Sequence, residues 1–120
     1  MFTKAGRIRK NSQFQQIYGR GKSYANRQLV LYVLENSHGI NRMGISISKK
    51  IGKAVVRNRH KRIIREAMRS ITPRLARDGY DFVVIARAGV VGMGRDEVAS
   101  SLIHLLKKHG LVGAPLGRGI

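Results

Sequence analysis

Cysteine and tryptophan are absent from this sequence, and only two of its 120 residues are proline. Without cysteine, disulfide bonds, thiolate metal sites and thiol catalysis are excluded, and a reducing cytosol is compatible with the chain. No apolar run is long enough to cross a bilayer, and none follows the basic residues near the N-terminus as it would in a secretory signal. We therefore predict a cytoplasmic protein.

Acidic residues are scarce as well, with six Asp and Glu against 24 Lys and Arg, so the net charge is +18. A folded domain this basic repels itself unless a partner or counter-ions neutralise it, and nucleic acid is the leading partner. An anionic membrane surface is the rival partner. The acids show no grouping that suggests a metal centre, and we find no nucleophile–base arrangement. Any reactive groups are therefore expected to come from another molecule.

The spacing of apolar residues predicts one α+β domain over residues 1–110 and a flexible tail over 111–120. The predicted order is α-β-β-α-β-α, a two-layer sandwich of helices on a small sheet. Asn11 or Ser12 can cap the first helix, with Gln15 three residues after Ser12 as in a capping box, and the helix stops at Gly19. The first two strands are predicted to form an antiparallel hairpin. The remaining predictions are strands over 23–34, 43–48 and 80–86, a central helix over 54–76, and a last helix that has Asp96 and Glu97 in its first turn and ends at Gly110.

The stretch from Lys49 to Arg69 is the densest run of positive charge, KKIGKAVVRNRHKRIIREAMR, with Glu66 as its single acid. Such charge has to face solvent or a polyanion, because an unpaired buried charge is costly. On a helical projection the apolar residues and His60 fall on one side and most cations on the other. A solvated face would mix both signs, whereas arginine offers planar donors suited to phosphate. We therefore interpret this helix as a phosphate-binding surface.

Phe14 and Tyr18 are four residues apart and share one face of the first predicted helix. Two interpretations remain open: the pair anchors this helix in the core, or it forms a stacking platform for unpaired bases. Strand alternation places Val30 and Tyr32 on one face of the sheet, so Tyr32 can join such a platform. The glycine-rich segment AGVVGMG lacks the spacing of a dinucleotide-binding loop and is predicted to be a flexible connection.

The charged stretch resembles the signature of the bacterial ribonuclease P protein subunit, with its Arg-Asn-Arg core at residues 57–59. The flanks agree: FQQIYGRGKSYANRQLVLYVL is similar to the family's first helix and long strand, RMGISISKKIG to its next strand, and DFVVIAR to the strand after the signature helix. The resemblance covers residues 7–109. It implies a fold like the second domain of ribosomal protein S5, with a left-handed βαβ crossover around the signature helix.

The resemblance also implies a function. The protein would be the small basic partner of a catalytic RNA, and together they would remove the 5′ leader of precursor tRNA to give the mature 5′ end. The RNA, with Mg²⁺, would hold the active centre, so no catalytic residue is assigned to this chain, and no membrane or protein partner is implied. The implied RNA-binding residues are Arg57, Asn58, Arg59, Lys61, Arg62, Arg65, Arg69, Lys49, Lys50 and Lys53, with Asn58 also a candidate metal ligand, and the implied leader cleft consists of Phe14, Tyr18, Val30 and Tyr32.

Three other functions are compatible with the composition. A ribosomal or general RNA-binding protein would share the basic surface, and only the signature argues against it. A DNA-binding regulator would place the basic helix in a major groove, but no dimerisation segment is evident. A self-sufficient nuclease would cleave RNA alone, which the lack of grouped carboxylates argues against.

Overall fold

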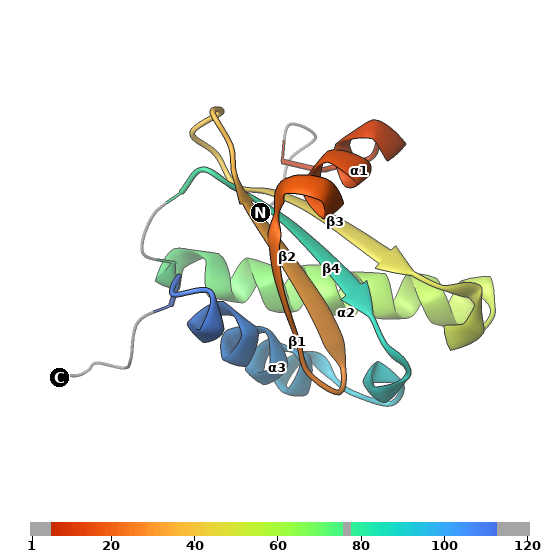
Figure 1. Ribbon diagram of the computed structural model, residues 1–120. Coiled ribbons are helices and arrows are strands. Elements are labelled where there is room, and N and C mark those ends of the chain that lie inside the picture. Colours follow the sequence, from red (N-terminus) through yellow and green to blue (C-terminus); the bar gives the residue numbers. More distant parts are fainter. Residues whose placement is uncertain (1–5, 76–77, 113–120) are drawn as a thin grey trace, which may run out of the picture.

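The computed structural model describes residues 6–75 and 78–112, and this part of the chain is an α+β sandwich with three α-helices on a four-stranded sheet (Figure 1). The predicted fold class is confirmed. The elements are α1 (Asn11–Arg20), β1 (Lys22–Ala25), β2 (Leu29–Glu35), β3 (Arg42–Ile47), α2 (Ala54–Ile71), β4 (Tyr80–Ala86) and α3 (Arg95–Lys108), with single 3₁₀ turns at Lys49–Ile51, Thr72–Arg74 and Ala88–Val90.

The sheet has the strand order β1-β2-β4-β3, in which β2 is antiparallel to both β1 and β4, and β3 is parallel to β4. The predicted hairpin between residues 43–48 and the preceding strand is therefore wrong, because β4 lies between β2 and β3. The sequence of β4, YDFVVIA, is almost wholly buried. A strand covered on both faces has to be nearly apolar throughout, so β4 takes an inner position.

The segment 23–34, predicted as strand, is two strands that fold back on each other. The break is at Asn26, whose Oδ1 accepts hydrogen bonds from the backbone N–H groups of Gln28 (3.1 Å) and Leu29 (2.9 Å). An asparagine side chain that bonds the backbone two or three residues on makes a tight turn without glycine or proline. The described order is therefore α-β-β-β-α-β-α, with one strand more than predicted.

The connection from β3 through α2 to β4 is left-handed, as the family resemblance implies. In Figure 1, β3 and β4 run in the same direction and α2 lies behind the sheet. If Figure 1 is turned within its plane until both arrows point upward, β4 lies to the right of β3 and α2 still lies behind the sheet. A connection that runs from β3 through a helix behind the sheet to a strand on the right is left-handed. The usual rule for parallel strands predicts the opposite hand.

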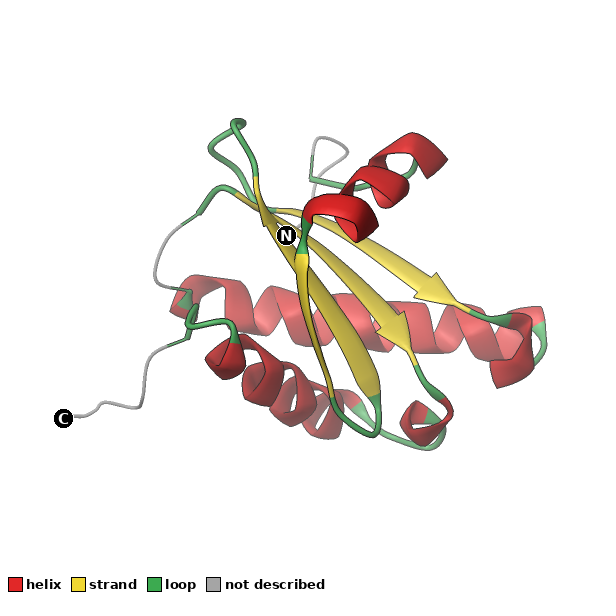
Figure 2. Ribbon diagram, viewed as in Figure 1, coloured by secondary structure: helices red, strands yellow, loops and turns green. Residues whose placement is uncertain are grey.

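The two faces of the sheet are covered differently (Figure 2). Helices α2 and α3 pack on one face over the main core, which includes Leu31 and Phe82. The other face carries only α1, among the described helices, over a smaller cluster around Ile17. The alternation predicted for β2 is confirmed, because Val30 and Tyr32 lie on the α1 face while Leu31 is buried beneath the two long helices.

Both predicted helix boundaries nearest the site need correction. Helix α1 is capped by Gln13 rather than by Ser12 and Gln15, since its Oε1 accepts hydrogen bonds from the N–H groups of Arg9 and Lys10. Helix α2 ends at Ile71 instead of residue 76. The cause is Pro73, which has no N–H and cannot continue an α-helix, so the chain closes with the turn Thr72–Arg74.

Two segments predicted to be loose are part of the core. Leu111 and Val112, placed by prediction in the flexible tail, are buried in the main cluster. The rest of that tail, residues 113–120, lies outside the described residues. The AGVVGMG connection contains the turn Ala88–Val90, and Val90 is fully buried. A short loop can therefore bury an apolar side chain even where glycines dominate its sequence.

An ion pair joins the starts of β3 and β4. Arg42 donates from Nε to Asp81 Oδ1 (2.7 Å) and from Nη2 to Oδ2 (2.6 Å), and Asn36 donates to Asp81 Oδ1 at 2.8 Å. The Asp81 side chain is 5% exposed. The hydrogen bonds to Asp81 raise the pKa of Arg42 above its usual value. This bidentate pair fixes the register of the two parallel strands.

Candidate nucleic-acid interface

Helix α2 separates its apolar and cationic residues along its length. The side chains of Ile64, Met68 and Ile71 are buried. Because successive residues of a helix turn by about 100°, Asn58, Arg62 and Arg69 lie on the side turned to solvent, and each is exposed. The predicted division of this helix into a core side and a cationic side is confirmed for these residues, whereas the Arg65 side chain is partly buried.

His60 lies on the core side of α2, as predicted. It is 6% exposed, and its Nδ1 lies 2.8 Å from the carbonyl oxygen of Val56 one turn earlier. A histidine held in this way is a packed residue. It is not available as a ligand.

A second row of cations follows the flank of α2 that is nearest β3. Arg57, Lys61 and Arg65 are spaced four residues apart, and all three are partly buried. The Nε–H of Arg57 donates to the carbonyl of Gly52 at 3.2 Å, which ties this side chain to the loop before the helix. Burial lowers the pKa of Arg65, and the neighbouring charge of Arg7 lowers it further.

Arg59 does not lie with Arg57, although the two enclose Asn58 in the signature. Two residue steps place their side chains about 160° apart around the helix axis. Arg59 is exposed, and so are Lys49, Lys50 and Lys53 in and after the 3₁₀ turn that precedes α2. A partner that contacts the whole predicted set therefore has to wrap around the first turns of α2.

The aromatic residues of the predicted cleft gather beside α1 on the opposite face of the sheet. The Tyr18 and Tyr32 rings meet edge to face with centroids 5.0 Å apart, and the Phe14 ring lies 6.2 Å from that of Tyr18. All three are partly buried against the smaller cluster. Val30 lies on the same face of the sheet, two residues before Tyr32 in β2, and is partly exposed. The three rings therefore combine packing with accessible surface, which leaves both interpretations of Phe14 and Tyr18 compatible with the geometry.

Gly44 on β3 sets the position of Phe14, a role that sequence reasoning did not find. A Cβ at Gly44 would lie 2.8 Å from the Phe14 ring and 3.1 Å from Ile8 Cβ. Only a residue without a side chain therefore lets this ring approach the strand so closely. The available signal was the glycine in MGISIS, which interrupts an otherwise β-favouring segment.

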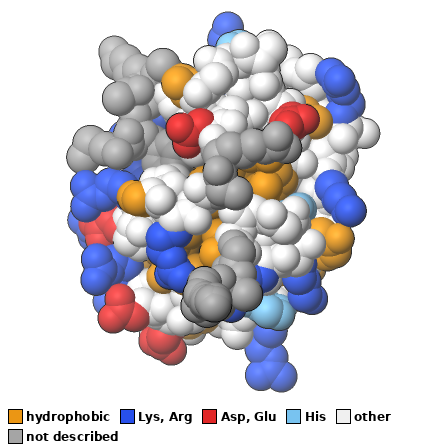
Figure 3. Space-filling model, turned by 90° about the vertical axis from the view of Figure 1, so that its left-hand side faces the viewer, with side chains coloured by type: hydrophobic (Ala, Val, Ile, Leu, Met, Phe, Trp, Pro, Cys, Tyr) orange, Lys and Arg blue, Asp and Glu red, His pale blue; other side chains and the backbone are white. Residues whose placement is uncertain are grey.

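The excess positive charge is not confined to α2. Figure 3 shows one end of the molecule, where Lys and Arg side chains lie along both sides and acidic side chains lie among those of one side. Across the described residues, two salt bridges are present, Arg42–Asp81 and the exposed pair Arg95–Asp96. Most cations of the described chain are therefore available to an anionic partner.

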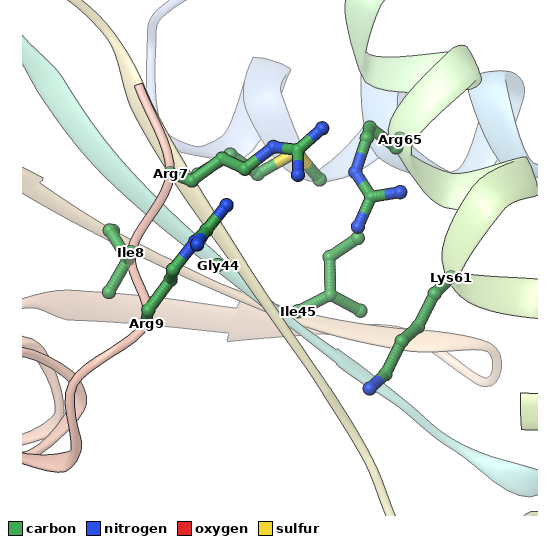
Figure 4. Close-up of a pocket in the computed structure, with 8 residues that line it drawn as sticks. Arg7, Ile8, Arg9, Gly44, Ile45, Lys61 and Arg65 are labelled. Atoms are coloured by element: carbon green, nitrogen blue, oxygen red, sulfur yellow. The ribbon is translucent and has the colours of Figure 1, made fainter. Parts of the chain in front are cut away.

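Two further arginines, outside the predicted site, lie beside α2. Arg7 and Arg9 line a pocket of about 240 Å³ together with Lys61 and Arg65, and Ile45 of β3 lies between the two pairs (Figure 4). They come from the segment before α1, which pairs with β3 through a bridge between Arg7 and Met43. Nothing in the sequence around Arg7 and Arg9 predicts this contact. Its proximity to α2 depends on the tertiary structure.

Within residues 6–75 and 78–112, no three His, Asp or Glu side chains group as they would around a metal ion. The same part of the chain has no helix that is long and apolar enough to span a membrane.

These observations define a small basic α+β domain that carries a cationic helix on one face of its sheet and an aromatic cluster on the other. The chain belongs to the ribonuclease P protein family, since the family model "Ribonuclease P" matches residues 2–110. It is 49% identical over 108 residues to the ribonuclease P protein component of Clostridium botulinum strain 657, a match that covers 90% of this chain and 97% of that protein.

Solved structures agree with this assignment. The RNase P protein of Staphylococcus aureus superimposes with a TM-score of 0.81 at 42% identity, covering 92% of this chain and 100% of that one. The RNase P protein of Thermotoga maritima gives 0.76 at 33% identity, covering 85% and 96%. The fold is therefore that of the bacterial RNase P proteins.

Proposed function

We propose that this chain is the protein subunit of a ribonucleoprotein ribonuclease P. In this function it binds a catalytic P RNA through α2 and the 5′ leader of precursor tRNA through the aromatic cluster beside α1. The observation that carries the proposal is the arrangement of the two surfaces on opposite faces of one sheet, in a chain that belongs to the ribonuclease P family. Two RNA molecules can then be held at once by a domain of 120 residues.

The cations of α2 supply affinity and orientation. Contacts to phosphates fix the position of a protein on RNA and carry little sequence information. Arg62 and Arg69 are exposed and, within the described residues, have no side-chain partner, so their guanidinium groups can each bind a phosphate oxygen pair. Neutralising phosphates also reduces the repulsion between P RNA and precursor tRNA, which lowers the Mg²⁺ concentration that the pair requires.

The aromatic cluster suits a leader whose sequence varies. Stacking on Phe14, Tyr18 or Tyr32 accepts any base, because every base has a π-face. Contacts to the leader exist in the precursor and are lost once the leader has been removed. The protein therefore favours substrate over product without recognising a sequence.

Mg²⁺ belongs to the RNA in this proposal. When bound there, it supplies the charge stabilisation and water activation that phosphodiester hydrolysis needs. On this chain, Asn58 is the candidate ligand, and its neighbours Arg57 and Arg59 are cationic. A divalent ion beside Asn58 would need RNA phosphates for its remaining ligands and for charge balance.

The test is a cleavage assay at low Mg²⁺ with precursor tRNA, a bacterial P RNA and this protein, alone and together. We expect cleavage at the mature 5′ end only when RNA and protein are both present. Cleavage by the protein alone would place the active centre in this chain. Tight RNA binding without any stimulation would instead indicate a general RNA-binding protein.

A further inference from the structure

The pocket at the edge of β3 is not explained by the surfaces described above. Resting on the proposed function, we propose that Arg7, Arg9, Lys61 and Arg65 together bind one RNA phosphate at this edge. The site adds Arg7 and Arg9 to the RNA-binding residues. It also lies where the surface of α2 meets the α1 side of the sheet.

The charge in the pocket is uncompensated. Arg7 and Arg9 enter from the segment before α1, and Lys61 and Arg65 enter from α2 on the other side, as Figure 4 shows. No acid is among the lining residues. Within the described chain, none of the four side chains has a hydrogen bond or an ion pair. Like charges held together in this way repel one another, and a phosphate between them would remove that repulsion.

The dimensions suit a phosphate rather than a single ion-paired side chain. The pocket volume is about 240 Å³, and one water takes about 30 Å³ of liquid volume. A phosphate group with several waters therefore fits. Burial and Arg7 both lower the pKa of Arg65, which is consistent with cations that face each other across a partly desolvated space.

The backbone of β3 adds a donor to the pocket. The N–H and the carbonyl of Met43 both point to the edge of β3 that faces away from β4. The N–H donates to Gly6 O at 2.8 Å, and the carbonyl accepts from Ile8 N–H at 2.9 Å. Peptide groups of alternate residues in a strand point the same way. The N–H of Ile45 therefore points to the same free edge, and Ile45 lines the pocket. Backbone N–H groups combined with arginines are a common phosphate-binding arrangement.

The position of the pocket gives it a consequence for RNA binding. Helix α2 covers one face of the sheet beside β3, and Phe14 of α1 lies against Gly44 of β3 on the other face. A phosphate held at Ile45 is therefore next to both surfaces. The RNA that supplies it is either the P RNA or the leader strand.

Cations at a sheet edge also prevent pairing with another strand, which is the competing explanation. That explanation predicts aggregation when the charges are removed and no effect on phosphate binding. The two explanations therefore differ in a measurable way.

The experiment uses the full chain and the variants Arg7→Gln and Arg9→Gln, with Lys108→Gln as a charge-matched control. Lys108 is exposed in the last turn of α3 and is outside every surface proposed above. Inorganic phosphate is titrated into ¹⁵N-labelled protein while amide resonances are followed. Binding of P RNA and of a single-stranded leader oligonucleotide is then measured separately as a function of salt, and circular dichroism checks that each variant is folded.

We expect the Gly44 and Ile45 amides to shift together and saturate with phosphate in the wild type and in Lys108→Gln, and to stop doing so in the two arginine variants. In each of the two arginine variants, the slope of log affinity against log salt should fall by about 0.7 to 0.9 for the RNA that supplies the phosphate. A change with P RNA alone identifies that RNA as the source, and a change with the oligonucleotide alone identifies the leader.

Unsaturable shifts spread over the surface, or salt slopes equal to those of Lys108→Gln in both RNA arms, would overturn the proposal. Folded variants that only aggregate would support the edge-protection explanation instead. If wild-type protein fails to stimulate P RNA cleavage, the proposed function fails by itself, because the phosphate titration examines the pocket independently of cleavage.

Discussion

Replacing Phe14 by leucine tests whether the α1 aromatic cluster binds the leader. Leucine keeps most of the apolar volume against Gly44 and the smaller cluster, and volume-conserving swaps cost less than about 1.5 kcal/mol of stability. The aromatic face is lost. One stacked base contributes about 1–3 kcal/mol, so the affinity of the reconstituted holoenzyme for precursor tRNA should fall about 5- to 140-fold at 1.4 kcal/mol per factor of ten. Affinity for mature tRNA should not change.

Ile17→Val is the matched control for this measurement. Ile17 is on the same helix and is 1% exposed, and this substitution costs about 0.5–1.5 kcal/mol through packing alone. Ile17→Val should lower the stability of the protein by about as much as Phe14→Leu does. It should leave the ratio between the affinities for precursor tRNA and mature tRNA unchanged. If Phe14→Leu lowers both affinities equally, or lowers neither, then Phe14 is only a core residue and the leader does not stack on it.

Three other predictions concern stability and phosphate contact. Arg42→Ala leaves Asp81 buried without its ion pair, so the free energy of unfolding in urea should fall by about 3–5 kcal/mol. Burial is the main cause that lowers the pKa of His109, so the His109 side chain takes up a proton more readily in the unfolded chain than in the folded one. The free energy of unfolding should therefore fall as the pH drops below about 6.5. His109→Gln should flatten that dependence on pH. Arg62→Ala should reduce the salt slope of P RNA binding by about 0.7 to 0.9, because this exposed side chain loses one phosphate contact.

Each of these has its own control. Adding Asp81→Asn to Arg42→Ala should recover part of the lost stability, and a single-variant loss below about 1 kcal/mol would contradict the reading of a buried pair. A His109→Gln variant whose stability depends on pH as steeply as that of the wild type would contradict the role given to His109. An Arg62→Ala slope no different from that of Lys108→Gln would remove Arg62 from the phosphate contacts.

Local patterns predicted most of the elements because local physics controls them. The 3.6-residue spacing in α2 predicts which side is buried, and the two-residue alternation in β2 predicts that Val30 and Tyr32 share a face. The signature with Asn58 at its centre predicts the family, which the comparisons confirm. Errors came where a single side chain decides the backbone path, as at Asn26, which splits the predicted strand, and at Pro73, which ends the helix.

Strand pairing was beyond local patterns. Nothing in residues 43–48 indicates whether β3 pairs with the strand before it or with the one after α2. The answer depends on which strand is apolar enough to be covered on both sides, and β4 takes that place. The same arrangement decides that Gly44 lies under Phe14 and that the free edge of β3 remains open.

The sequence alone therefore determined the composition of the surfaces: an excess of 18 positive charges, a helix with cations on one side, and aromatic residues at helical spacing. Only the tertiary structure decided where these surfaces lie. It placed the aromatic cluster and α2 on opposite faces of one sheet, and it brought Arg7 and Arg9 to Lys61 and Arg65 across β3. The physical reason is that charge and periodicity are properties of neighbouring residues, whereas a pocket forms between segments that only strand pairing and core packing bring together.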